Sequence, residues 1–230
     1  MGRRTFAVAL AAGAVVSGVQ VARLWPRLAT WGATDQEVLA TMAGDDLVGE
    51  PRYRSTHAVT IGAPPEAVWP WLVQIGQGRG GLYSYDWLEN LLGLDIHSAN
   101  SIDPRLQELA VGDVVRLVPE GTQPPLQFVV LDLKAPALLL LGPAGTRDEA
   151  FAAQLPYPFW TFQLTPHGLG NSRLVVRFQA DYEPTRLGDL AYQRLLRPVH
   201  FVMERKMLLG IRQRAECSVT LAPHLSVSPA

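Results

Sequence analysis

Residues 172–182 alternate between apolar and polar side chains over a full strand length, and this pattern restricts the fold more than any other part of the chain. One face carries Leu174, Val176, Phe178, Ala180 and Tyr182. The other carries Arg173, Arg177, Gln179 and Asp181. Such alternation predicts a strand of an antiparallel sheet with one buried face and one face in water. The preceding segment, 166–171, is rich in turn residues and predicts a hairpin.

The remaining elements follow from similar patterns. Further strands are predicted at residues 53–61, 113–118, 126–133, 137–141 and 157–164. One helix is predicted from the Pro64-Pro65 pair to Ile75 and a second from Ser84 to Gly93, because proline suits a first turn and glycine a helix end. A last helix is predicted at 185–214, with a restart or kink at Pro198.

Three segments carry a resemblance to a known family. They are Thr60-Ile-Gly-Ala-Pro-Pro-Glu-Ala-Val-Trp69, Trp160-Thr-Phe-Gln-Leu164 and Arg173-Leu-Val-Val-Arg-Phe178. With the order of elements, they resemble the START-like or helix-grip superfamily, often called SRPBCC, over about residues 53–216. The resemblance implies an α+β fold in which a curved antiparallel sheet wraps around the C-terminal helix and encloses a mostly apolar chamber. That fold serves many functions, so the resemblance predicts architecture better than activity.

The N-terminal segment departs from this pattern. Residues 6–22 are almost entirely apolar, with Arg3 and Arg4 before them and Arg23 and Arg27 after them. We therefore expect a single membrane-spanning helix of open orientation, and less strongly a cleaved export signal followed by an exported soluble form. The expected organisation is a hydrophobic anchor or signal at 1–28, a juxtamembrane helix and linker at 29–52, the helix-grip domain at 53–217 and a flexible tail at 218–230.

Composition excludes several classes of function. Twenty basic and 21 acidic side chains give a formal net charge of −1, which supplies no field for holding nucleic acid. The single cysteine, Cys217, cannot form an intramolecular disulfide or a thiolate metal site. We expect no metal, no cofactor and no nucleic-acid partner.

Candidate catalytic residues lie in the polar and aromatic segment 78–98. Tyr83, Asp86 and Asn90 fall near one helical side, and His97 could fold over them, so Tyr83, Asp86 and His97 could orient or enolise a carbonyl ligand. The alternative is structural, because serine and aspartate are common where a helix begins. The glycines of this segment carry no phosphate-loop lysine, which argues against a phosphate site.

Candidate ligand-binding residues follow from the strands and the last helix. His57 shares strand parity with Val59 and should point inward, either as a hydrogen-bonded core residue or toward a ligand. The full predicted set is His57, Trp69, Trp87, Asn90, Trp160, Phe162, Phe178, Val199 and Met203. His200 and Glu204 lie one turn apart on a polar stripe and are interpreted as a solvated or ion-paired face rather than a metal site.

Three functions remain open at this point. The first is membrane-tethered binding or carriage of an apolar small molecule or lipid in the chamber. The second is a cyclase or dehydrase acting on an apolar ligand that bears a carbonyl group. The third is a protein-interaction module, which would have a filled core and no chamber.

Overall fold

The computed structural model describes residues 27–91, 93–123, 125–153, 156–182, 185 and 197–221. One six-stranded sheet organises this part of the chain. Its strands are β1 (Tyr53–Ile61), β2 (Val114–Arg116), β3 (Gln127–Lys134), β4 (Leu138–Gly142), β5 (Tyr157–Pro166) and β6 (Ser172–Asp181). They lie in the order β1-β6-β5-β4-β3-β2, and every neighbouring pair is antiparallel. A strand was predicted at each of these places, and the hairpin between β5 and β6 closes through His167 N, which donates to Asn171 O at 2.9 Å.

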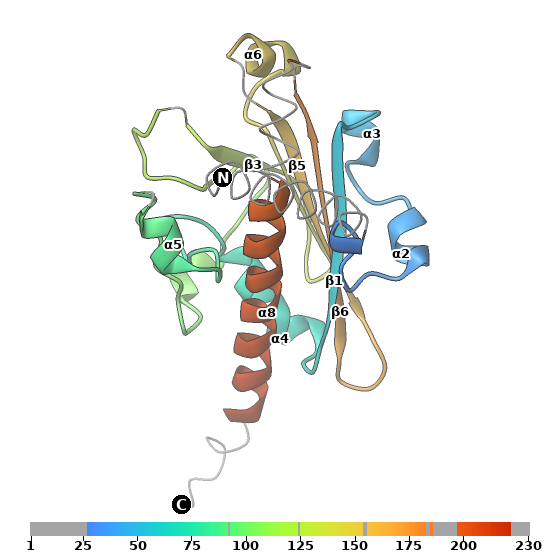
Figure 1. Cartoon of the computed structure of the whole chain (residues 1–230). Helices are drawn as coiled ribbons and strands as arrows, with labels where there is room; N and C mark the ends of the chain where they lie inside the picture. The colour runs from blue at the N-terminus through green and yellow to red at the C-terminus, as the bar shows by residue number, and fades with distance from the viewer. Residues whose placement is uncertain are drawn as a thin grey trace, which may run out of the picture.

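Two helices cover one face of the sheet. The long helix α8 (Arg197–Leu221) crosses in front of it, beside α4 (Pro65–Val73), as Figure 1 shows. Pro198 lies in the first turn of α8, where its missing N–H costs no hydrogen bond. The predicted α+β class is confirmed, and the arrangement is consistent with a helix-grip fold. The part of the last helix predicted at 186–196 lies outside the described residues.

Shorter helices lie around this framework. They are α2 (Asp35–Leu39), α3 (Asp45–Val48), α5 (Asp86–Leu91), the 3₁₀ turn η1 (Pro104–Leu106) and α6 (Arg147–Ala152). The main hydrophobic core lies between the sheet, α4 and α8. Its largest fully buried apolar side chains include Trp71, Tyr83, Phe162, Leu72 and Leu164. These side chains fill the middle of the space in which the sequence predicted a chamber.

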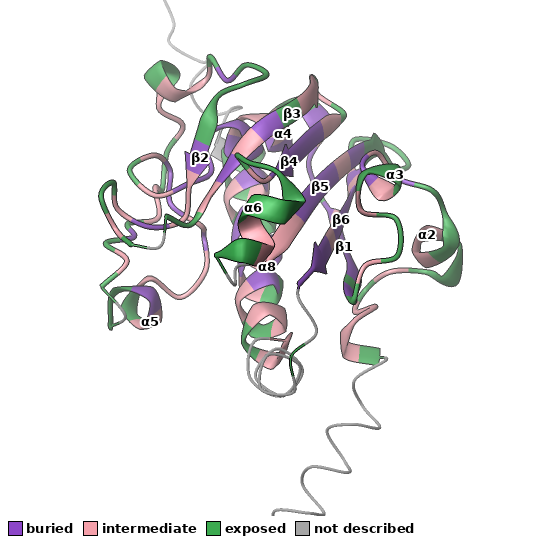
Figure 2. Ribbon diagram, turned by 90° about the horizontal axis from the view of Figure 1, so that it is seen from above, coloured by how far each residue is buried: buried purple, intermediate pink, exposed green. Residues whose placement is uncertain are grey.

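The opposite face of the sheet differs from the prediction. Arg177, Gln179 and Asp181 on β6 are buried, although their alternation predicted a face in water. Residues 33–48, which contain α2 and α3 and are called the covering segment below, pack across β1 and β6 on this face (Figure 2). The prediction of a face in water is therefore wrong. Periodicity within a strand could not show that a segment distant in sequence covers its polar side.

Arg177 is the centre of this covered face. Its guanidinium donates to Thr56 Oγ1, to Asp45 Oδ2 at 2.6 Å, and to three backbone carbonyls at the end of α2. Those carbonyls belong to Glu37, Val38 and Ala40. Since the last carbonyls of a helix lack partners within it, this one side chain completes the C-terminal end of α2.

Residues 28–32, called the edge segment below, line the outer side of β1. Thr56 N donates to Ala29 O at 2.8 Å and Ala58 N donates to Trp31 O at 3.1 Å. Gly32 then turns the chain at a φ of 74°. A Cβ atom at this position would lie 2.1 Å from the carbonyl oxygen of Ala58, so only glycine fits.

The prediction of a membrane protein is contradicted. Within the residues that the structure describes, no helix combines the length and the apolar character needed to cross a bilayer. The predicted span itself, residues 6–22, lies outside the described residues. Residues 29–48, predicted as part of a juxtamembrane linker, pair with β1 and pack on the sheet instead of standing apart from it. The domain boundaries stay predictions, although α8 continues to Leu221 into the segment predicted as a flexible tail.

Candidate functional site

Charged and aromatic side chains meet inside the molecule between β1, β5 and the first half of α8. His57 points inward from β1, as its parity with Val59 predicted. Glu204 lies on the inner face of α8, one turn before the core residues Met207 and Leu208. Together with Trp160 and His200 they form what is called the His57–Glu204 cluster below.

Every carboxylate oxygen of Glu204 has a partner in this cluster. Oε2 is hydrogen-bonded to Nδ1 of His57, and Oε1 accepts from the indole Nε1 of Trp160 at 2.7 Å. Nε2 of His200 lies 3.5 Å from Oε1, the distance of an ion pair. The other ring nitrogen of His57 lies 2.9 Å from the carbonyl oxygen of Leu28 in the edge segment. A buried charge requires such partners, because burying a carboxylate without them costs roughly several kcal/mol of solvation free energy.

The two charges stabilise each other. Burial alone would raise the pKa of Glu204, but the positive charges of His200 and His57 hold it well below its ordinary range. Burial alone would lower the pKa of His57, but the charge of Glu204 and the hydrogen bonds to Glu204 and Leu28 raise it. Both ring nitrogens of His57 are occupied, so this histidine has no free nitrogen for a substrate proton.

Aromatic rings connect the cluster to one end of the sheet. The rings of Phe178 and His200 are 4.3 Å apart between centroids, and Tyr53 meets His200 edge-on at 5.8 Å. Trp160 in turn packs against Phe128 of β3 at 5.9 Å. Phe128 therefore contacts Trp160 of the cluster, and it also lines a cavity.

This cavity, called the α6 cavity below, has a volume of about 260 Å³ and lies at the α6 end of the sheet. It is open to solvent, since Phe128 alone of its described lining residues is buried. It is lined by Leu117, Pro125, Leu126, Gln127, Phe128, Pro143, Ala144, Gly145, Thr146, Glu149, Ala150, Ala153, Pro156 and Pro158. Its volume is slightly below the roughly 300–1,000 Å³ of most small-molecule sites. A compact ligand fits such a space better than a long-chain lipid.

The polar groups of the α6 cavity are few. Thr146 and Glu149 form the capping box at the start of α6, in which Thr146 N donates to Glu149 Oε2 at 2.8 Å. The hydrogen bonds from Thr146 hold the pKa of Glu149 below its ordinary value, so this carboxylate is charged at neutral pH. Since the described lining includes no basic side chain, the cavity has no counter-charge for an anionic ligand.

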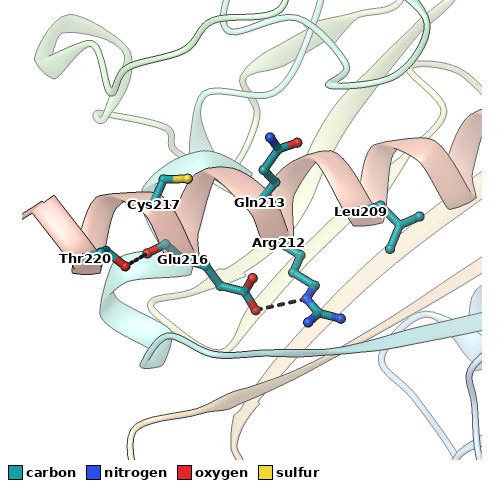
Figure 3. A pocket seen from close by; sticks show the side chains of 6 residues that line it. All are labelled: Leu209, Arg212, Gln213, Glu216, Cys217 and Thr220. Atoms are coloured by element: carbon teal, nitrogen blue, oxygen red, sulfur yellow. Dashed lines mark hydrogen bonds and ion pairs between the residues drawn. The ribbon is translucent and has the colours of Figure 1, made fainter.

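A second hollow runs along the C-terminal half of α8. Its volume is about 490 Å³, and its lining residues are Leu209, Arg212, Gln213, Glu216, Cys217 and Thr220 (Figure 3). Arg212 donates to Glu216 at 2.9 Å, and Glu216 also accepts from the backbone N–H of Gly62 at 2.8 Å. The groups that line it are mainly exposed and already paired, so it is a surface groove beside a helix.

The structure does not bring the functional groups of the predicted catalytic residues together. The hydroxyl of Tyr83 donates to the backbone oxygen of Trp71 within the core. Asp86 accepts from Ser98 N at 2.8 Å and from Ser98 Oγ at 2.6 Å. His97 is exposed and pairs with Asp95 at 3.1 Å. Each group has a separate structural partner, so the catalytic role of the three stays a prediction without a shared geometry.

The predicted ligand-binding residues are spread over several environments, and none of them lines the α6 cavity. His57, Trp160 and Phe162 are buried, Trp69, Phe178 and Met203 are half-buried, and Trp87, Asn90 and Val199 are exposed. His57, Trp160 and Phe178 meet in or beside the His57–Glu204 cluster. Asn90 instead holds the backbone of Ile96 through two hydrogen bonds.

Sequence reasoning missed the α6 cavity and the position of Glu204. The spacing of Thr146 and Glu149 is a capping-box signal that could have indicated α6. Glu204 was placed on a solvated or ion-paired face. It is ion-paired, but it is buried. Within the described residues, no group of three or more histidine, cysteine, aspartate or glutamate side chains could hold a metal ion.

Comparison with known proteins gives only weak likenesses. No protein-family model matches the chain, and no curated protein matches it. Among solved structures, the Aha1 dimer of Colwellia psychrerythraea is 16% identical, with 71% of this chain and 96% of that chain covered and a TM-score of 0.40. A point mutant of norcoclaurine synthase from Thalictrum flavum, in complex with a transition-state analogue, is 15% identical, with 76% and 96% covered and a TM-score of 0.42. The KanY protein is 12% identical, with 73% and 99% covered and a TM-score of 0.45. Values this low assign neither a family nor a function.

Proposed function

We propose that this protein is a START-like, helix-grip (SRPBCC) domain that binds a compact, uncharged and mostly apolar molecule in the α6 cavity. The observation that carries the proposal is the lining of that cavity. It consists largely of proline, leucine, alanine and phenylalanine side chains, with one carboxylate and no basic group among the described residues. Ligand sites in proteins commonly combine an apolar wall with a few polar groups in this way.

The charge of the lining also selects the ligand. An anionic molecule, such as a fatty acid, would lie near the exposed carboxylate of Glu149 with no basic partner in the described lining, and the two like charges repel each other. A neutral aromatic or alicyclic compound would pack against Phe128 and Leu126 at no such cost. We therefore propose neutral ligands over carboxylates of the same shape.

The test compares naphthalene with naphthoate. The two probes share one ring system, and naphthoate carries an additional carboxylate. We expect naphthalene to bind the full chain and naphthoate to bind at least about tenfold more weakly, a difference of about 1.4 kcal/mol. Titration followed by the fluorescence of each probe gives both affinities. Equal affinity for both probes would show that the lining does not select by charge.

Two variants of α6 locate the site. Ala150 lines the cavity, whereas Ala152 is exposed on the same helix and does not line it. Ala150→Trp should fill the cavity and weaken naphthalene binding at least about tenfold, while Ala152→Trp should bind as the unaltered chain does. The same affinity in both variants would place the ligand elsewhere and reject the α6 cavity as the site.

A further inference from the structure

The short helix α5 turns apolar side chains outward. Trp87 is 68% exposed and Leu91 is 75% exposed. These residues are one helical turn apart, so they share one face of α5, and that face looks into solvent. A helix on a protein surface normally directs such a face toward the core.

The inward side of the same helix carries an acid. Glu89 is only 2% exposed, and neither of its carboxylate oxygens has a hydrogen-bond partner among the described residues. Burial, aided by the negative charge of Asp86, raises the pKa of Glu89 to about 7. Buried polar groups in proteins are nearly always hydrogen-bonded, so this arrangement needs an explanation.

Polar contacts, rather than an apolar face, hold α5 in place. Asp86 accepts from Ser98, Asn90 is bonded to the backbone of Ile96 at 2.8 and 2.6 Å, and Ser84 donates to the backbone oxygen of Met203 on α8 at 3.1 Å. These hydrogen bonds are what a turn of this six-residue helix would break, and they lie at part-buried positions.

We propose that α5 is a two-position element that exchanges its faces when Glu89 ionises. In the position described here Glu89 is buried and Trp87 and Leu91 are exposed. In the second position the Glu89 carboxylate reaches water, and Trp87 and Leu91 turn toward the neighbouring helix α8. The first position keeps the hydrogen bonds of Ser84, Asp86 and Asn90, but it buries the acid and exposes the apolar side chains. The second position gives up those hydrogen bonds, returns the carboxylate to water and covers the apolar side chains.

The direction of the change follows from the charges around Glu89. Because an acid whose pKa is raised binds its proton more tightly in the buried position, that position is favoured at low pH and loses its advantage as the pH rises through about 7. The charged groups on the neighbouring elements include Asp86 on α5 and Asp95 and His97 in the following loop. From α8 they include Lys206, over Tyr85 at 5.8 Å, and Arg214, over Tyr83 at 5.0 Å. His97 pairs with Asp95 in the loop that follows α5, and it therefore needs its own control.

The experiment follows Trp87 in the full chain. Acrylamide quenching is measured from about pH 5 to about pH 9 in the unaltered protein and in Trp87→Phe, and the difference isolates the signal of Trp87. Glu89→Gln removes the ionisable carboxylate, and His97→Gln removes the imidazole of the neighbouring loop as a control. Far-UV circular dichroism on each sample shows that it remains folded.

We expect the quenching of Trp87 to fall about twofold as the pH rises through 7, because the population shifts toward the position in which Trp87 is covered. The transition should persist in His97→Gln and disappear in Glu89→Gln. A constant or rising accessibility of Trp87, a transition that survives in Glu89→Gln, or one that is lost in His97→Gln would each overturn the proposal.

Discussion

At the scale of single residues, Glu204 shows how an acid is tolerated in a core. Its two oxygens meet His57, Trp160 and His200, and its charge is matched inside the molecule rather than by water. Removing one member of such a pair leaves the other buried and uncompensated, whereas replacing both with apolar side chains removes the problem.

We expect Glu204→Gln to lower the free energy of unfolding by about 3–5 kcal/mol, because His57 then loses the carboxylate that stabilises its protonated form in the core. The double variant His57→Leu with Glu204→Leu should lose less than the sum of the two single variants. Urea denaturation of Glu204→Gln and of the four proteins of the cycle (the unaltered protein, His57→Leu, Glu204→Leu and the double variant) measures this. Additive losses would mean that the pair is not coupled.

The same pair gives a pH dependence whose sign is fixed. The folded pKa of Glu204 is lowered, so its contribution is present above the ordinary value of 4.5 and is lost as the pH falls below it. The folded pKa of His57 is raised, so its contribution is full below the ordinary value of 6.5 and is lost as the pH rises through the higher folded value. The difference in the free energy of unfolding between the unaltered protein and the double leucine variant should therefore be greatest between about pH 4.5 and pH 6.5.

The inward direction of His57 could be predicted from strand parity, but its partner could not. Glu204 belongs to a polar stripe of α8, and spacing along a helix does not show which side of it meets the sheet. The catalytic hypothesis for Tyr83 and His97 had the same weakness. Their closeness in sequence did not show that one side chain enters the core and the other faces solvent.

At the scale of elements, the covering segment depends on one arginine. Arg177 carries a planar fork of donors, and its partners are the end of α2, Thr56 and Asp45. A lysine at this position would keep the charge but could not reach carbonyls in several directions.

We expect Arg177→Lys to cost roughly 1–3 kcal/mol of stability, since buried carbonyls lose their donors. Hydrogen exchange should become faster in residues 34–48 before it does so in β5 or β6. The matched control is Arg212→Lys, whose pair with Glu216 is partly exposed and should matter little. Unchanged exchange in the covering segment would show that other contacts hold it.

Two glycines, Gly32 in the edge segment and Gly49 outside it, allow the cost of backbone strain to be separated from the cost of a steric clash. Gly32 and Gly49 both have positive φ, at 74° and 69°, but only Gly32 would bring a Cβ against the backbone of Ala58. Gly49→Ala should cost about 1–3 kcal/mol for its backbone conformation, with φ 69° and ψ −109°. Gly32→Ala should cost clearly more, because its Cβ would also meet the backbone of Ala58. Thermal unfolding compares them. Equal losses would mean that the edge segment moves away from β1 without penalty.

Strands were the most predictable elements because their patterns are local. All six strands follow hydrophobic alternation or short apolar runs, and the run at 138–141 is the mainly buried strand β4. The burial of the polar face of β6 depends on residues more than a hundred positions earlier, so no property of the strand itself could reveal it.

At the scale of the whole molecule, α8 and α4 lie on one face of the sheet, and the covering segment lies over β1 and β6 on the other (Figure 2). The sequence placed a chamber between the sheet and α8, but large core side chains such as Trp71 and Phe162 occupy the middle of that space. The α6 cavity lies where the core ends. Its position depends on loops and on α6, whose fold the strand patterns do not determine.

The pairing of the edge segment with β1 also bears on how copies of this chain meet one another. An open sheet edge offers free backbone groups to any extended chain that passes, and this is a common start of aggregation. Ala29 and Trp31 occupy that row on β1, while β2 at the opposite edge has three residues and receives a hydrogen bond from Gln77 at 2.8 Å. Copies in which the edge segment has been displaced would therefore stack strand against strand through β1, so a few residues ahead of the first strand keep neighbouring molecules apart.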